Sequence, residues 1–243
     1  MRILVIGESC LDVFHYGECG RLCPEAPVPV FNSTFSVDSG GMAMNVYNNL
    51  KCFINNIDIH TNNNWREIKK TRFVDEKANH MFMRLDENDQ AYGRVALNQI
   101  DFTMYDAVVV SDYNKGYLNE EDLKNISGLH PKTFLDTKKT LGEWCKNFSF
   151  IKINGVEYDK TKHLLDDEIK KIMIVTQGSK GCFYRETCYS VPLVEVKDVS
   201  GAGDTFLASF SYKYLLTEDV DKSIDFANQC ATQVVQKRGV STL

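Results

Sequence analysis

Residues 198–210, DVSGAGDTFLASF, place two glycines and an aspartate directly before an apolar run. Gly201 and Gly203 allow a tight turn and the close approach of a ligand to the backbone. The apolar residues that follow recur at the spacing of one helix face, so the pattern predicts a helix after Asp204. Unpaired N–H groups and the helix dipole make such a helix start an anion site. An aspartate there predicts a general base beside a phosphate charge; the alternative is a helix N-cap.

Composition and charge exclude several classes of protein. The 243 residues include 28 Lys and Arg against 33 Asp and Glu, a formal net charge of -5. The basic residues are scattered rather than gathered in a stripe, which argues against nucleic acid as a partner. Residues 1–7 hold only four consecutive apolar residues, too few for a signal peptide or a membrane span, so we expect a cytoplasmic protein with no membrane partner. The eight cysteines form no Cys-x-x-Cys pair, which predicts free thiols.

Apolar strand-like runs alternate with helical patterns along most of the chain. This alternation predicts an α/β fold with a doubly wound, mostly parallel sheet between two helix layers. Right-handed crossovers would then bring the carboxyl ends of the parallel strands to one edge of the sheet. Buried strands are expected at residues 2–6, 107–110, 133–135, 150–153 and 171–175, a hairpin at 182–191, and helices at 119–126 and 220–236.

Two segments, residues 13–38 and 68–99, break the alternation. The first carries three prolines between residues 24 and 29, which exclude a helix and the central positions of a sheet. The second contains runs of alternating apolar and polar residues, as in half-buried strands. We interpret both as excursions that form a small β lid on a single domain of residues 1–243. Between them, residues 39–41 are expected to form a tight turn that leads into a helix.

Polar residues and glycines recur just past the predicted strand ends. In open α/β sheets a ligand binds in the crevice outside the carboxyl ends of the strands. Isolated helix caps or surface residues would not fall there so consistently, and this favours a phosphate-handling enzyme with one shared crevice. The residues in question are Asp12, Asp112, Lys115, Asp136, Asn154, Glu157, Thr176, Gly178, Gly181 and Asp204.

Four motifs in order resemble those of the ribokinase-like, phosphofructokinase-B type carbohydrate kinases. Residues 198–204, DVSGAGD, resemble the signature loop of that family, and residues 39–45, SGGMAMN, its sugar-binding glycine stretch. Residues 152–157, KINGVE, resemble its Asn-x-x-Glu element, and residues 176–181, TQGSKG, its nucleotide loop. Each motif alone is weak, but their shared order is specific. The resemblance implies a three-layer α/β/α ribokinase-like fold with a β lid.

Finer features are similar to one branch of the family, the D-glycero-D-manno-heptose 7-phosphate kinases of ADP-heptose synthesis. They are DVFHYG at residues 12–17, RLCPEAPVP at 21–29, RLD at 84–86 and SDYNKG at 111–116. This resemblance implies ATP-dependent phosphorylation of the anomeric hydroxyl to give the 1,7-bisphosphate. It also implies a homodimer that forms through the lid.

The resemblance assigns roles residue by residue. It implies that Asp204 is the general base, and that Gly201, Ala202 and Gly203 hold charge on the transferred phosphoryl group. It implies Mg²⁺ organised by Asn154 and Glu157 through water, and K⁺ or another monovalent cation near Asp198, for which an N-cap is the alternative. The residues implied to bind ATP are Lys152, Asn154, Thr176, Gly178, Gly181 and Asn228. Those implied to bind the sugar phosphate are Asp12, Arg21, Gly40, Gly41, Asn45, Arg84, Asp86 and Lys115; solvated surface is the alternative for Arg84 and Lys115.

The chain departs from the family pattern in two places. The segment between Leu50 and Lys70 is shorter by about one βα unit, and the chain stops at Leu243, which leaves only the kinase step of a fused heptose enzyme. Two other functions stay open: a kinase for another sugar or sugar phosphate, and a non-catalytic ligand-binding descendant of the fold. A Rossmann oxidoreductase is disfavoured, because residues 7–12 lack the Gly-x-Gly-x-x-Gly turn.

Overall fold

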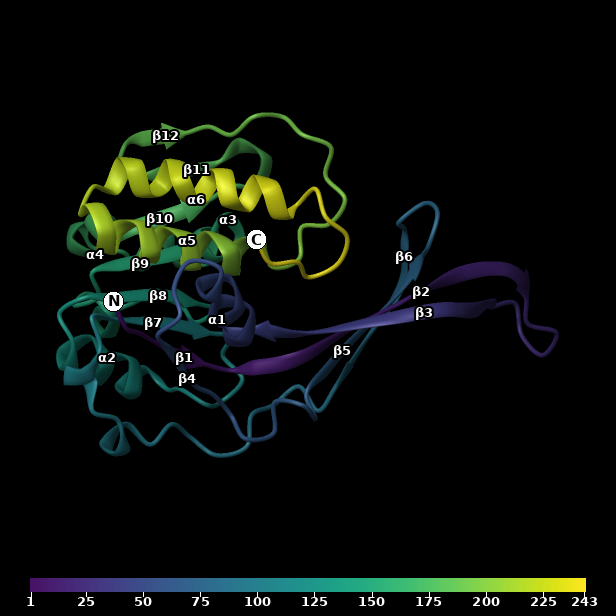
Figure 1. Ribbon diagram of the computed structural model, residues 1–243, viewed down its shortest axis with the longest axis horizontal. Helices are drawn as coiled ribbons and strands as arrows, with labels where there is room; N and C mark the ends of the chain where they lie inside the picture. Colours follow the sequence, from purple (N-terminus) through teal and green to yellow (C-terminus); the bar gives the residue numbers. More distant parts are fainter.

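The computed structural model describes all residues 1–243 and is built on an eight-stranded sheet (Figure 1). Six strands are parallel, and the hairpin of β11 and β12 adds an antiparallel edge. The order across the sheet is β12 (Thr187–Tyr189), β11 (Cys182–Tyr184), β10 (Met173–Thr176), β9 (Phe150–Asn154), β8 (Thr133–Thr137), β7 (Ala107–Asp112), β1 (Ile3–Gly7) and β4 (Ile57–His60).

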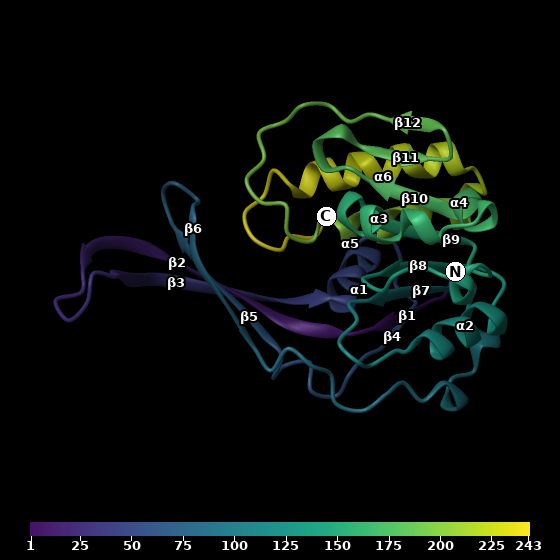
Figure 2. The ribbon, with the colours of Figure 1, turned by 180° about the vertical axis from the view of Figure 1, so that it is seen from behind.

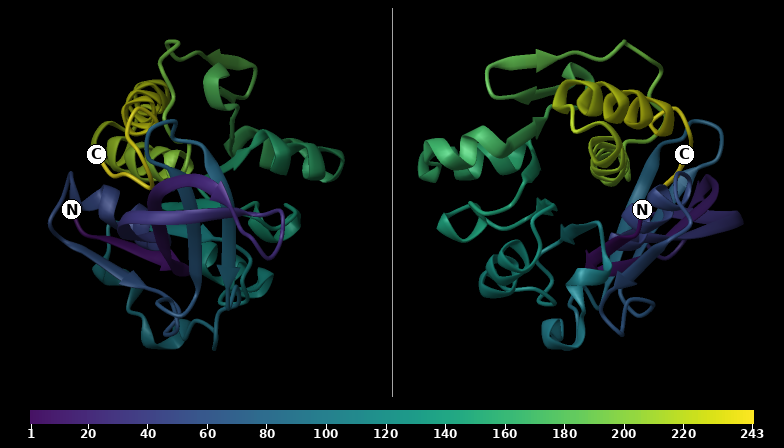
Figure 3. Two further views of the ribbon diagram at one scale, coloured as in Figure 1. Left: turned by 90° about the vertical axis from the view of Figure 1, so that its right-hand side faces the viewer. Right: turned by 60° about the vertical axis from the view of Figure 1, so that its left-hand side comes forward.

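Helices cover both faces of this sheet, because alternate residues of each strand point to opposite sides (Figure 3). Ile3 and Val5 of β1 pack in one core with α1 (Ala43–Lys51), α5 (Ala202–Thr217) and α6 (Val220–Val234). Leu4 and Ile6 pack in the other with α2 (Glu120–Leu129) and α4 (Asp167–Ile172), and α3 (Gly155–Thr161) follows β9 directly. Short 3₁₀ turns lie at Leu97–Gln99, Phe102–Met104, Glu143–Cys145, Lys162–Leu164 and Gly178–Lys180. None of the helices combines the length and apolar character needed to cross a bilayer.

A second, four-stranded sheet projects from the body as an arm (Figures 1 and 2). Its order is β3 (Pro29–Met42), β2 (Ser9–Leu22), β5 (Lys69–Asp75) and β6 (Met81–Glu87), with only the β2–β5 pair parallel. We call these four strands the lid sheet. Strand β2 begins beside the body and β3 ends there. Because β2 pairs with β5, the two predicted lid segments form one sheet.

The prediction of a tight turn at residues 39–41 is wrong. Gly40 and Gly41 complete β3 and pair with Leu11 and Cys10 of β2, and α1 starts only at Ala43. The turn is made by Met42, which takes a positive φ of 59°. The glycines are required by close packing instead, because a Cβ on Gly41 would lie 2.0 Å from Oδ2 of Asp12.

Candidate active site

The first turn of α5 presents Asp204 in a buried position where only 4% of the residue is exposed. Gly201 caps this helix with a left-handed φ of 81°, which a glycine adopts without strain. A Cβ on Gly203 would lie 2.7 Å from Nζ of Lys152, so that residue must also be small. The glycine loop therefore lets the backbone of the helix start reach the site, as the sequence pattern predicts.

Both carboxylate oxygens of Asp204 accept a hydrogen bond. The hydroxyl of Tyr113 donates to Oδ1 at 2.9 Å, and Nδ2 of Asn45 donates to Oδ2 at 3.0 Å. Burial is the main cause that raises the pKa of Asp204 to about 6, with the Asn45 hydrogen bond opposing it, and with nearby Asp136 adding to it. A carboxyl group with a pKa near neutral suits proton transfer at physiological pH.

Tyr113 and Lys115 are held by a buried carboxylate that the sequence motifs do not single out. Glu8, fully buried at the end of β1, accepts hydrogen bonds from the backbone N–H of Tyr113 at 2.8 Å, and of Lys115 and Tyr117 at 3.1 Å each. Burial and the nearby Asp112 raise the pKa of Glu8 above its usual value. The loop after β7 is thereby fixed to the end of the neighbouring strand.

A cavity of about 500 Å³ opens on one side of Asp204. Its wall includes the backbone of the glycine loop and an apolar stretch at residues 191–196. Every residue expected to bind ATP lines it: Lys152, Asn154, Thr176, Gly178, Gly181 and Asn228. A polar end beside a helix N-terminus and an apolar end fit a molecule with both phosphates and a base.

A second cavity, of about 410 Å³, lies between Asp204 and the base of the lid sheet. Of the residues expected to bind sugar phosphate, Asp12, Arg84, Asp86 and Lys115 line it. Three charged residues that we did not predict, Lys70, Arg72 and Asp89, complete its wall. Four residues line both cavities, and the two spaces therefore meet at this point: Tyr113, Lys138, Gly201 and Asp204.

Ion pairs join the charges of the second cavity. Arg72 binds Asp12 at 2.5 Å, and Arg84 binds Asp86 at 2.7 Å. Lys70 contacts Asp89 at 2.8 Å, and the same carboxylate also binds Lys115. Partial burial raises the pKa of Asp86 and of Asp89, but their basic partners lower it more, so that both pKa values lie below the usual value. Asp86 and Asp89 are therefore ionised near neutral pH, and the basic side chains of the wall supply donors for an anionic, hydroxyl-bearing ligand.

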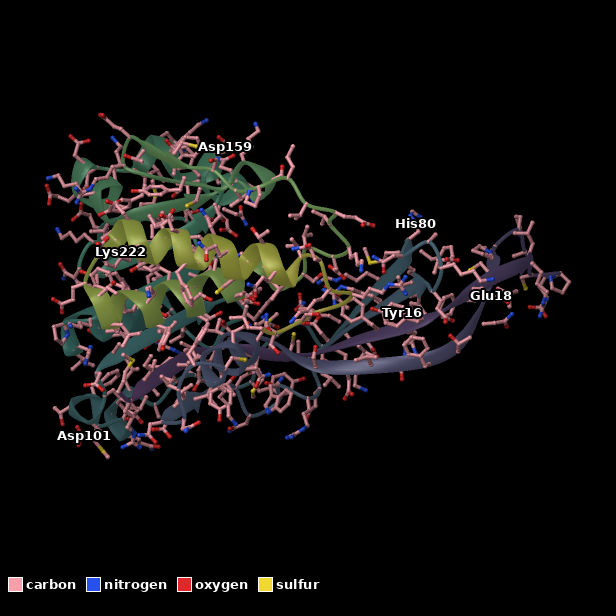
Figure 4. All side chains as sticks on the ribbon, turned by 45° about the horizontal axis from the view of Figure 1, so that its top comes forward. Tyr16, Glu18, His80, Asp101, Asp159 and Lys222 are labelled. Atoms are coloured by element: carbon pink, nitrogen blue, oxygen red, sulfur yellow. The ribbon has the colours of Figure 1, made fainter.

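Four predicted substrate residues do not line this cavity, and one of them, Asn45, donates its side-chain amide to Asp204 instead. Gly40 and Gly41 do not line it, although Gly41 gives room to the carboxylate of Asp12. Arg21 is exposed, lies one residue before the end of β2 and pairs with Val30 on β3; Glu18 of the same strand lies far out on the arm in Figure 4. The expectation that Arg21 joins the same site is therefore wrong within this chain, because a 14-residue strand carries it away from the body.

The residues implied for Mg²⁺ are bonded mainly to one another. Asn154 and Glu157 form a capping box at the start of α3, and Glu157 also binds Lys138 at 2.6 Å. Close by, Oδ1 of buried Asp136 has no hydrogen-bond partner, while Oδ2 of Asp136 binds Lys152 at 2.7 Å. These carboxylates fit Mg²⁺, which takes one or two protein carboxylates together with water and substrate phosphate.

The residue implied for a monovalent cation is bound to its own loop. Oδ1 of Asp198 accepts a hydrogen bond from the backbone N–H of Ser200 at 2.8 Å, and the helix itself is capped by Gly201. The N-cap alternative for Asp198 is therefore wrong, and the contact that the structure gives this carboxylate is one that fixes the loop before α5.

The fold and the site define a class of protein. The chain superposes on ribokinase from Thermotoga maritima with a TM-score of 0.70 over 99% of this chain and 94% of that one, at 14% identity. Phosphofructokinase-2 from Escherichia coli, in complex with potassium, gives 0.68 over 99% and 94%, also at 14%. The fold is ribokinase-like, and the expected fold class is confirmed.

Sequence comparison narrows the class. Residues 142–243 match the model of the pfkB family carbohydrate kinases. The chain is 30% identical to the bifunctional protein HldE of a Nitratiruptor species, and 31% identical to that of Helicobacter acinonychis. These alignments cover 99% and 98% of this chain but 63% of each relative, so the chain spans less than two thirds of their length. The matches confirm the resemblance to the pfkB family carbohydrate kinases that the motifs indicate.

Proposed function

We propose that this chain transfers a phosphoryl group from ATP to the anomeric hydroxyl of D-glycero-D-manno-heptose 7-phosphate. The observation that carries the proposal is the place of Asp204, a buried carboxyl with a raised pKa where the two cavities meet. A general base must reach the acceptor hydroxyl and lie beside the transferring group, and a junction of this kind satisfies both needs.

The geometry gives each element of the site a part in the reaction. ATP occupies the cavity beside α6 with its phosphates at the start of α5, and the sugar phosphate occupies the cavity under the lid sheet. Asp204 accepts the proton as the sugar oxygen attacks the γ-phosphorus. The N–H groups at residues 201–203 stabilise the charge that spreads over the transferred group. Mg²⁺, held near Asp136 and Glu157, would neutralise phosphate charge.

The charges of the second cavity favour a sugar that already bears a phosphate. Lys70, Arg72, Arg84 and Lys115 all line a space suited to a small polar molecule. A neutral sugar needs hydroxyl partners but no cations, whereas a phosphate dianion needs several charged donors and would compete with Asp12, Asp86 and Asp89 for these four side chains. The heptose is suggested by the likeness of the lid sequence to the heptose branch and by the HldE relatives.

An ADP-release assay tests the proposal. Purified protein with ATP and Mg²⁺ is given heptose 7-phosphate, fructose 6-phosphate or ribose. We expect turnover with the heptose phosphate, and a loss of about 10²–10⁴-fold in Asp204→Asn, because the base is removed. ATP binding, measured by calorimetry, should be close to normal in that variant. Unchanged turnover in Asp204→Asn would contradict the role of the carboxyl.

Three finer expectations belong with this function. The apolar residues Met83 and Leu85 are exposed on the lid sheet and support a homodimer through that sheet. A monovalent cation near Asp198 would order the loop before the glycine motif. A cytoplasmic location fits a kinase that uses ATP.

A non-catalytic ligand-binding protein is the second candidate. The observation that favours this candidate is that the chain is shorter than the matching part of its relatives. The alignment with the Nitratiruptor protein is 290 positions long, whereas this chain has 243 residues, so the alignment contains gaps in this chain. ATP binding without turnover on any sugar in the same assay would select this candidate.

A further inference from the structure

Lys138 has a position that no other basic residue shares. It follows β8 directly, and it is the only lysine or arginine that lines both cavities. Lys152 lines only the first cavity, where Asp136 holds its ammonium group at 2.7 Å. Lys70 and Lys115 line only the second cavity. Lys138 therefore stands on the path between the two spaces.

The ammonium group of Lys138 lies between the carboxylates of Glu157 and Asp136, beside the point where the two cavities meet. Its Nζ lies 2.6 Å from Oε1 of Glu157, 3.7 Å from Oδ1 of Asp136 and 5.1 Å from the ring centre of Tyr113. Nearly a third of the side chain is exposed to the cavities. Burial lowers the pKa of Lys138, but the carboxylates of Asp136 and Glu157 raise it more, so its pKa lies above the usual value and the side chain carries its positive charge at neutral pH.

The ion pair between Lys138 and Glu157 is not needed to hold Glu157 in place. Glu157 already accepts hydrogen bonds from the backbone N–H and the side-chain amide of Asn154, each at 2.8 Å. These bonds complete the capping box that starts α3. The helix start thus has its cap without Lys138, and the exposed part of this side chain lies where a ligand of either cavity can contact it.

We propose that Lys138 is a catalytic residue whose ammonium group contacts the phosphoryl group while it passes from the first cavity to the second. The proposal rests on the proposed kinase function. In the transfer, the acceptor hydroxyl oxygen bonds to the γ-phosphorus, and the bond from that phosphorus to the β–γ bridging oxygen breaks. The electron pair leaves on ADP, and the hydroxyl proton passes to Asp204.

The negative charge of the transferred phosphoryl group explains why a cation at this place would speed the reaction. In this step negative charge moves with the three equatorial oxygens of the phosphoryl group, and catalysis consists largely of positioning and electrostatic stabilisation. Lys152 is fixed beneath Gly203 and the cations of the lid sheet lie in the second cavity only. Lys138 reaches both sides, so one charge can accompany the group from donor to acceptor.

The test compares Lys138→Met with Lys138→Arg and with Lys132→Met as a matched control. Lys132 likewise forms an ion pair, to Glu218, but it lines neither cavity. We expect kcat of Lys138→Met with heptose 7-phosphate to fall about 10²–10³-fold, as when one donor to a transition-state oxygen is lost. The KM for ATP should change by less than about threefold, Lys138→Arg should recover part of kcat, and Lys132→Met should match the wild type.

Calorimetry with ADP and tetrafluoroaluminate provides a second readout that does not depend on turnover. In the presence of the sugar phosphate, the wild type should bind ADP more tightly when the fluoride complex, which mimics the transferring group, is added. Lys138→Met should lose this gain and keep the affinity for ADP alone.

The outcomes separate this inference from the kinase proposal. Wild-type kcat in Lys138→Met, or an equal loss of affinity for ADP alone, overturns the role of Lys138 while the kinase function stands. If Lys138→Met does not fold by circular dichroism, the charge-free Lys138→Gln variant takes its place: an unchanged kcat together with an unchanged gain from tetrafluoroaluminate overturns the proposal. A wild type that turns over no sugar overturns both.

Discussion

Two opposing effects set the proton affinity of Asp204. Burial among the first residues of α5 disfavours the charged carboxylate, whereas the donors Asn45 and Tyr113 favour it, and the result is a pKa of about 6. A carboxyl with its ordinary pKa near 4 would be a weak base, and one with a much higher pKa would be protonated at neutral pH. The site therefore combines a usable base strength with ionisation under physiological conditions.

Replacement of Tyr113 by Phe tests this balance. The change removes the hydrogen bond that stabilises the ionised carboxylate, so the pKa of Asp204 should rise. Because the base works only when ionised, activity is lost as pH falls through that pKa. The acidic limb of the kcat/KM profile should therefore move from near pH 6 to higher pH, by about one unit for the loss of one hydrogen bond to a charge.

The control is Tyr47→Phe, on α1 and outside both cavities, which should leave the limb in place. An acidic limb that is identical in Tyr113→Phe and the wild type would show that this hydroxyl does not tune the base.

At the scale of elements, the inner ends of β2 and β3 border the second cavity, which we propose holds the sugar phosphate. Asp12 lies in β2, its carboxylate binds Arg72 of β5, and the backbone of Gly41 in β3 passes directly against it. Three strands thus fix one carboxylate. Gly41 acts here by leaving room for Asp12 and Gly40 by leaving room for Met44, and neither glycine lines the second cavity.

Gly41→Ala should disturb this arrangement selectively. The added Cβ would lie 2.0 Å from Oδ2 of Asp12, so the carboxylate must shift from its place in the cavity wall. The loss of a charged hydrogen bond to substrate predicts a KM for the sugar phosphate raised about 10- to 100-fold, with the KM for ATP nearly unchanged.

Gly128→Ala is the matched control for this prediction. Gly128 lies in α2, and a Cβ there would meet no atom within 4 Å. We expect both KM values to be unchanged and the free energy of unfolding to increase by about 0.4–1 kcal/mol. If Gly41→Ala raised both KM values equally, the effect would be general rather than local to Asp12.

At the scale of the whole molecule, the lid sheet is the part that the body does not cover. Met83 and Leu85 are two residues apart on β6 and face the same side of the sheet, where they are 53% and 44% exposed. Side chains of this kind on an extended sheet favour association with another surface. The arm shown in Figure 2 is therefore the surface on which the proposed homodimer depends.

The double variant Met83→Glu, Leu85→Glu should abolish that dimer. Two charges on the apolar face oppose its burial against a second copy. Light scattering after gel filtration should give a wild-type mass of twice 27.7 kDa and a variant mass of 27.7 kDa. Leu164→Glu, at a site with 54% exposure on the body, is the control and should leave the mass unchanged. A wild-type monomer at micromolar concentration would contradict the proposal.

Much of the fold and part of the candidate site could be predicted from local patterns. The strands of the main sheet are short apolar runs, and the helix start at residues 201–204 follows from two glycines and an apolar face. The rule that ligands bind past parallel strand ends then gathered Asp204, Asn154, Thr176 and Lys115 correctly around one place. Tyr113 and Lys138 also follow strand ends, so the same rule could have found them, but neither belongs to the four motifs of the wider family.

The sequence by itself determined most strands of the main sheet, the helices α1, α2, α5 and α6, the glycine loop before Asp204 and the family to which these motifs are similar. Each of these depends on residues close together in the chain. Only the tertiary structure decided that Gly40 and Gly41 end a strand, that Arg21 lies far out on the lid sheet, and that Lys70, Arg72 and Asp89 join the second cavity. These facts depend on pairing between strands far apart in sequence, and a side chain's distance from the site is set by that register. The raised pKa of Asp204 likewise depends on the tertiary structure, because the carboxyl group becomes buried only when α1, α5 and the loop after β7 pack together.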